Sequence, residues 1–143
     1  MMLWTFIVAG AIVIASLGIA VPWRRRQSAL KVLLAREALD DDAVYSRFYA
    51  DTGLPKAEVL KSWHDIADTL RVPAERLRPN DRFGKDIGVY WITSDELDEL
   101  AAKGRKRAKE LGLTVDLEKL STVDEYVRCF AGSFYDILVS KLR

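Results

Sequence analysis

Residues 72–88 read VPAERLRPNDRFGKDIG, and Thr93-Ser94-Asp95-Glu96-Leu97 follow shortly after. Two prolines and Gly84 interrupt the first stretch, so a regular helix or strand is not expected there. We predict a long loop whose apolar residues anchor it to a helical core; these residues are Val72, Leu77, Phe83 and Ile87. Thr93 and Glu96 have the three-residue offset of a capping box, which satisfies backbone amides at a helix start. A helix is therefore predicted to begin at Ser94.

Helices are predicted on both sides of this loop. Upstream, apolar residues recur at spacings of three and four from Pro55 to Leu70, which indicates an amphipathic helix with a wide buried stripe. Downstream, the helix from Ser94 is expected to end near Gly112, and Ser121 or Thr122 to cap a last helix. Val89 to Ile92 would suit a short strand, but no partner strand is evident, so we interpret it as an apolar loop insertion. The expected fold class is all-α.

The beginning of the chain is a long apolar run from Leu3 to Val21, LWTFIVAGAIVIASLGIAV, without a charged residue. As a helix rising about 1.5 Å per residue, it is long enough to cross about 30 Å of hydrocarbon. Trp4 and Trp23 bracket the run, and Arg24-Arg25-Arg26 follow it, which favours a transmembrane helix with the arginines in the cytoplasm. A cleaved secretory signal is the alternative, but its basic region should precede the apolar run.

Residues 1–23 are thus predicted to be a single-pass anchor in a bacterial-type inner membrane, with the N-terminus outside and the C-terminal domain in the cytoplasm. Residues 24–54 contain the basic flank, a juxtamembrane helix from Gln27 to Leu39, and a connecting helix that Asp40 to Asp42 cap and Gly53 ends. Residues 55–143 form the helical domain. Residues 27–54 either pack on that domain or form a separate stalk.

Composition gives little support for an enzyme, a metal site or a nucleic-acid partner. The net charge is +1, and one short basic run without an aromatic platform is weak evidence for nucleic-acid binding. His64 is the single histidine and has no companion ligand nearby in the sequence. Cys129, the single cysteine, lies in an apolar helical pattern that favours a small core residue. We expect a non-catalytic protein without a metal ion.

Several short segments between about residues 57 and 131 resemble acyl carrier proteins in their order and spacing. The segments are Ile66-Ala67-Asp68-Thr69-Leu70, Val72-Pro73-Ala74-Glu75-Arg76-Leu77, Asp81-Arg82-Phe83, Asp86-Ile87-Gly88, Leu111-Gly112-Leu113-Thr114-Val115 and Ser121-Thr122-Val123-Asp124-Glu125-Tyr126-Val127. The resemblance implies a long first helix, a long loop, a second helix that bears the phosphopantetheine serine, a short third helix and a final helix. The domain is therefore expected to be an acyl-carrier-like helical bundle.

The resemblance also implies that Ser94 occupies the attachment position of 4'-phosphopantetheine. Carrier proteins usually read Asp-Ser-Leu a couple of residues after the glycine, whereas here Val-Tyr-Trp-Ile-Thr lies between Gly88 and Ser94. Helix starts favour serine for capping alone. Ser94 is therefore either a cap or an attachment point.

Partner contacts are predicted at three places. The apolar insertion carries Tyr90 and Trp91, which are the kind of aromatic anchors that dominate interfaces, unless Trp91 fills the open end of the bundle. The start of the second helix is acidic, as in carrier proteins, through Asp95, Glu96, Asp98 and Glu99. The basic run at its end is either a solvated face or a second contact with anionic lipid. The predicted membrane-contacting residues are Trp4, Trp23, Arg24, Arg25, Arg26, Lys103, Arg105, Lys106, Arg107 and Lys109.

Two functions follow from these features. In the first, a membrane-anchored, cytoplasm-facing, acyl-carrier-like domain is a non-catalytic interaction or scaffold module for a protein partner that the sequence does not identify. In the second, the domain is a genuine acyl or aminoacyl carrier that bears phosphopantetheine on Ser94 and is served by acyl-loading enzymes.

Overall fold

The computed structural model describes residues 23–88 and 95–141, with side chains up to residue 132. The predicted membrane span with Trp4, the insertion from Val89 to Ile92, and Thr93 and Ser94 lie outside the described residues. Every regular element within the described part is a helix, which confirms the all-α class for that part of the chain. Two isolated bridges, Arg82 with Thr122 and Phe83 with Ile87, do not extend into strands. None of the helices described is long and apolar enough to cross a bilayer.

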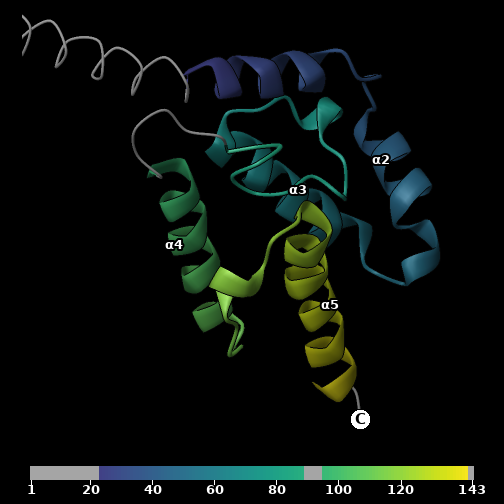
Figure 1. Ribbon diagram of the computed structural model, residues 1–143. Coiled ribbons are helices and arrows are strands. Elements are labelled where there is room, and N and C mark those ends of the chain that lie inside the picture. Colours follow the sequence, from purple (N-terminus) through teal and green to yellow (C-terminus); the bar gives the residue numbers. More distant parts are fainter. Residues whose placement is uncertain (1–22, 89–94, 142–143) are drawn as a thin grey trace, which may run out of the picture.

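The central element is α3 (Lys56–Leu70), which packs against α2 (Asp41–Phe48), α4 (Asp95–Glu110) and α5 (Val123–Lys141). Three short 3₁₀ helices complete the set: η1 (Ala50–Thr52), η2 (Ala74–Arg76) and η3 (Leu117–Lys119). A further helix over residues 23–34 lies across one end of the bundle, beside the loop of residues 71–88 (Figure 1). We refer to it as the 23–34 helix.

The apolar stripe of α3 forms the core, as the sequence pattern predicts. Its buried apolar side chains are Val59, Trp63, Ile66, Ala67 and Leu70. The indole of Trp63 is fully buried, and its N–H donates to the Ala74 carbonyl at 2.9 Å, which joins α3 to η2. The Tyr49 ring meets the Trp63 ring edge-on at 6.1 Å between centroids. Trp63 therefore links α3 to η2 through the Ala74 carbonyl and to the end of α2 through Tyr49.

The predicted helix end at Gly112 and the predicted caps at Asp40 and Thr122 are confirmed, whereas the connecting helix α2 ends at Phe48 and Gly53 instead follows η1. Gly112 has a φ of +67° and ends α4 in a Schellman motif, in which the Leu113 N–H bonds to the Ala108 carbonyl at 2.8 Å. Asp40 caps α2 by accepting from the Ala43 N–H at 2.7 Å. Thr122 and Glu125 form a capping box at α5, with the Glu125 N–H donating to the Thr122 hydroxyl oxygen at 3.2 Å.

The juxtamembrane helix is shorter than predicted, because it ends at residue 34 instead of Leu39. Beyond a turn, residues 37–40 have no regular secondary structure, and the Leu39 N–H donates to the Glu75 carbonyl at 2.8 Å. The side chains of Leu33 and Leu39 are both buried. Residues 27–54 consequently pack on the bundle and do not form a separate stalk.

Arg107 lies inside the bundle, so the predicted contact of this residue with a membrane is wrong. Its side chain is 10% exposed, and the guanidinium binds Glu58 Oε2 at 2.8 Å and Ser62 Oγ at 2.9 Å. Asp65 lies 3.4 Å away, and the guanidinium covers the Phe130 ring at 5.2 Å from the centroid. Residue 107 is buried because it falls on the same helical face as the buried Leu100 and Gly104. Its place within the basic run conceals this role in the sequence.

Replacement of Arg107 by Met should lower the free energy of unfolding by about 3 kcal/mol, because Glu58 and Ser62 lose their buried partner. Arg105→Met on the exposed side of α4 is the matched control and should change it by less than about 0.5 kcal/mol. Urea denaturation followed by circular dichroism measures both. Equal losses for the two variants would contradict the buried role of Arg107.

Candidate functional site

The basic flank and the acidic start of α4 meet at one end of the bundle, where the 23–34 helix lies beside the loop of residues 71–88. A small cavity of about 100 Å³ lies at this junction. Arg26 and Leu33 line it from the 23–34 helix, Leu70 and Arg71 from the end of α3, and Glu96 from α4. The basic flank and the acidic helix start, separated by some 70 residues in the sequence, are therefore neighbours.

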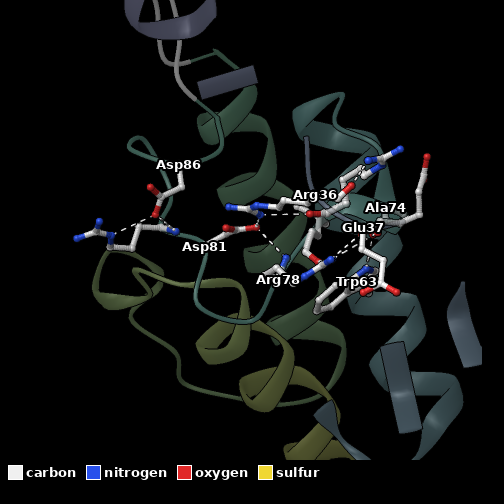
Figure 2. Close-up of polar contacts among 11 residues, drawn as sticks. Arg36, Glu37, Trp63, Ala74, Arg78, Asp81 and Asp86 are labelled. Carbon is white, nitrogen blue, oxygen red and sulfur yellow. Dashed lines mark hydrogen bonds and ion pairs between the residues drawn. The ribbon is translucent and has the colours of Figure 1, made fainter. Parts of the chain in front are cut away.

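A buried carboxylate holds this junction together. Asp81 is 3% exposed and accepts hydrogen bonds from the Arg36 guanidinium at 2.7 Å and from the Arg78 N–H at 2.8 Å (Figure 2). The hydrogen bond to Asp81 raises the pKa of Arg36 above its ordinary value. The guanidinium of Arg36 therefore keeps its charge beside the carboxylate.

Two more arginines, both in the loop of residues 71–88, bind the segment that contains Arg36. Arg76 donates to the carbonyls of Leu34, at 2.7 Å, and Arg36. Arg78 donates to the Glu37 carbonyl at 2.6 Å. We call Arg36, Arg76, Arg78 and Asp81 the arginine clasp. Because the clasp satisfies the carbonyl of Leu34 at the helix end and those of Arg36 and Glu37 just beyond it, it fixes this end of the 23–34 helix to the bundle.

The acidic start of α4 divides between two faces. Asp95, Asp98 and Glu99 are exposed and share a helical face with the exposed Ala102. Glu96 is half-buried and lines the small cavity beside Arg26. The sequence predicted the four carboxylates as one partner surface, whereas only three of them share this exposed face.

The basic end of α4 lies away from the basic flank. Figure 1 shows α4 beginning near the 23–34 helix and running from there toward the opposite end of the bundle. Arg105, Lys106 and Lys109 are exposed, and Lys103 contacts Thr69 Oγ1 and Glu99 Oε1, each at 3.0 Å. Trp23 and Arg24 to Arg26 are exposed at the beginning of the 23–34 helix. The two predicted groups of membrane-contacting residues are therefore separate patches.

An apolar cavity of about 160 Å³ lies along the other side of α4. Sequence reasoning missed it, because its walls come from four segments and each wall residue reads as ordinary core. Burial raises the pKa of the Tyr126 phenol in its wall to about 12, so the phenol stays neutral. A cavity of this size can hold an apolar group about as large as benzene. Its lining residues are Phe83, Leu97, Leu100, Ala101, Leu117, Leu120 and Tyr126.

Other reactive side chains have structural surroundings. His64 Nε2 lies 2.9 Å from Asp41 Oδ1 on the surface. Cys129 is half-buried against the core, and burial raises the pKa of its thiol, which disfavours the thiolate. Among the described residues, no group of three or more His, Cys, Asp or Glu side chains is arranged to hold a metal ion.

The comparisons with protein families, with curated proteins and with solved structures find no match for this chain. A function must therefore be argued from the residues and contacts of the chain itself.

The predicted attachment residue Ser94 lies outside the described residues. Helix α4 begins at Asp95, the residue that follows Ser94 in the sequence.

A double-mutant cycle on Arg36→Gln and Asp81→Asn should give a coupling energy of about 2 kcal/mol, because the carboxylate is buried and binds the guanidinium directly. The exposed pair of Arg47 and Glu37, at 58% and 69% side-chain exposure, is the control. Its cycle should give less than about 0.5 kcal/mol. Urea denaturation of the single and double variants measures both cycles, and similar couplings would argue against the clasp.

Proposed function

We propose that this protein is a non-catalytic interaction module with an acyl-carrier-like bundle, tethered to the cytoplasmic face of a membrane by its N-terminal segment. In this proposal the exposed acidic face of α4, formed by Asp95, Asp98 and Glu99, is the docking surface for a protein partner. The arginine clasp is the observation that carries the proposal. The clasp attaches the bundle to the helix that contains the basic flank, so it sets the orientation of α4 relative to that flank.

The order of the helices supports the carrier-like part of the proposal. A long α3, the loop of residues 71–88, α4, the short η3 and α5 follow one another as the resemblance implies. The loop anchors support it as well, because Leu77 and Ile87 are buried and Val72 and Phe83 pack against the core. These features concern architecture, so they support a carrier-like scaffold whether or not a prosthetic group is attached.

The charges support the membrane and partner parts. Arg24 to Arg26 are exposed and directly follow the apolar run, where cations favour the cytoplasmic side of a membrane. The acidic face of α4 is solvent-exposed and lies near this flank, where carboxylates also interact favourably with the helix dipole. A partner protein with a basic surface would therefore meet the acidic face of α4 close to the membrane.

Photo-crosslinking from within the acidic face tests this function. A benzophenone amino acid at the exposed Ala102 of the full chain, in native membranes, should give a discrete crosslinked protein. The same amino acid at the exposed Ala50, beside α2, is the matched control and should not. Asp95→Lys should reduce the crosslink about fivefold or more, because it places a repelling charge on the docking face.

Crosslinks of equal yield from positions 50 and 102 would contradict a dedicated docking face. An Asp95→Lys variant that crosslinks as the parent does would contradict the electrostatic part. The membrane pellet after alkaline extraction provides the second readout, because a tethered protein stays in it.

The apolar cavity favours a second function, that of a genuine carrier. Leu97, Leu100 and Ala101 line it from the first two turns of α4, close in the sequence to Ser94. A short acyl chain on a phosphopantetheine at Ser94 would find apolar shelter there, since burial removes its methylenes from water. Tyr126 contributes a neutral phenol to the same wall.

Intact-mass spectrometry of the protein co-expressed with a broad-specificity phosphopantetheinyl transferase tests whether Ser94 only caps a helix or carries phosphopantetheine. A carrier gains the mass of one phosphopantetheine, and Ser94→Ala removes that gain. The interaction module without a prosthetic group shows no gain while circular dichroism reports a folded protein.

A further inference from the structure

We infer that the groove between the 23–34 helix and the turn of residues 84–86 binds the phosphate headgroup of an anionic phospholipid. The inference rests on the proposed membrane tether and adds a ligand that neither the tether nor the docking face specifies. The groove has a volume of about 640 Å³. Its lining combines residues from two segments that lie more than 45 residues apart in sequence: Arg24, Arg25, Ser28, Ala29, Val32, Arg36, Gly84, Lys85 and Asp86.

The charge of the groove is strongly positive once the internal pairs are assigned. Arg36 is bound to Asp81 at 2.7 Å. Asp86 accepts from the Arg82 side chain at 3.2 Å and from the Arg82 N–H at 3.0 Å. These pairs neutralise one cation and the only carboxylate among the lining residues. Arg24, Arg25 and Lys85 remain, and within the described part of the chain none of them forms an ion pair.

Three cations around one groove suit a phosphate group. A guanidinium offers parallel N–H donors that match two phosphate oxygens, and an ammonium adds a compact charge. The Ser28 hydroxyl lies in the same lining and supplies a further hydrogen-bonding group. Lys85 is required because it lies on the turn opposite the helix, so the anion is held from both sides.

An exposed apolar side chain in the groove points to a lipid. Val32 lines the groove and is 63% exposed, while Trp23, Leu30 and Leu34 are exposed on the opposite face of the same helix. Apolar side chains next to arginines are typical of helices at a membrane interface, where the rings and methyl groups contact the acyl boundary and the cations contact headgroups. The first residue of the groove, Arg24, is also only three positions beyond Val21, the end of the apolar run.

Native mass spectrometry of the full chain in a mild non-ionic detergent tests the inference. Titration with phosphatidylglycerol should give a one-lipid adduct, while phosphatidylcholine should be retained at least about fivefold less. Lys85→Gln and Arg25→Gln should each weaken the phosphatidylglycerol adduct about fivefold, by loss of one cation near the headgroup. Lys61→Gln, an exposed lysine on α3 outside the groove, is the matched control and should leave the adduct unchanged. Circular dichroism confirms that each variant is folded.

Equal phosphatidylglycerol binding by the parent protein and by folded Lys85→Gln would overturn the inference. Complete displacement of the lipid by millimolar inorganic phosphate would overturn the lipid assignment in favour of free phosphate. Alkaline extraction of native membranes separates this result from the proposed function. A parent protein retained in the pellet without a lipid adduct refutes the groove alone, whereas a parent protein released into the supernatant refutes the tether and the groove together.

Discussion

The carboxylate of Asp81 is the constraint on which the arrangement of the segments depends. A buried negative charge is costly unless it is paired and hydrogen-bonded. Here the Arg36 guanidinium and the Arg78 N–H meet that requirement, while the Asp81 carbonyl accepts from the Val123 N–H at 3.0 Å. One residue therefore joins the N-terminal segment, the long loop and the start of α5. None of these segments can shift without leaving a buried polar group unpaired.

This constraint also explains why the small cavity and the basic groove lie beside the 23–34 helix. The clasp holds the 23–34 helix by the Leu34 carbonyl at its C-terminal end, and Leu33 packs into the core. The earlier turns of that helix are mostly exposed, with the small cavity on one side and the basic groove on the other. Arg24 to Arg26 and the first turn of α4 thereby come to lie near each other.

Arg107 and the acidic face of α4 show how far the sequence predicts the site. Exposed carboxylates at a helix start are readable from the chain, because capping and the helix dipole favour them there. The burial of Arg107 cannot be read from the sequence, since it depends on Glu58 and Ser62 of α3, which lie more than 40 residues away. The apolar cavity is likewise absent from the sequence pattern, because Phe83, Leu117 and Tyr126 meet only after α4 and α5 have packed.

By itself, the sequence determined the local elements of the described chain. The apolar stripe of α3, the cap at Asp40 and the helix end at Gly112 follow from short-range rules of periodicity, capping and backbone conformation. Only the tertiary structure decided that the 23–34 helix stops at residue 34 and that residues 27–54 belong to the bundle. The reason is physical: Leu39 leaves the helical pattern to bond with Glu75, and Arg36 leaves it to neutralise Asp81. Such gains come from partners about 40 residues away, which no local pattern contains.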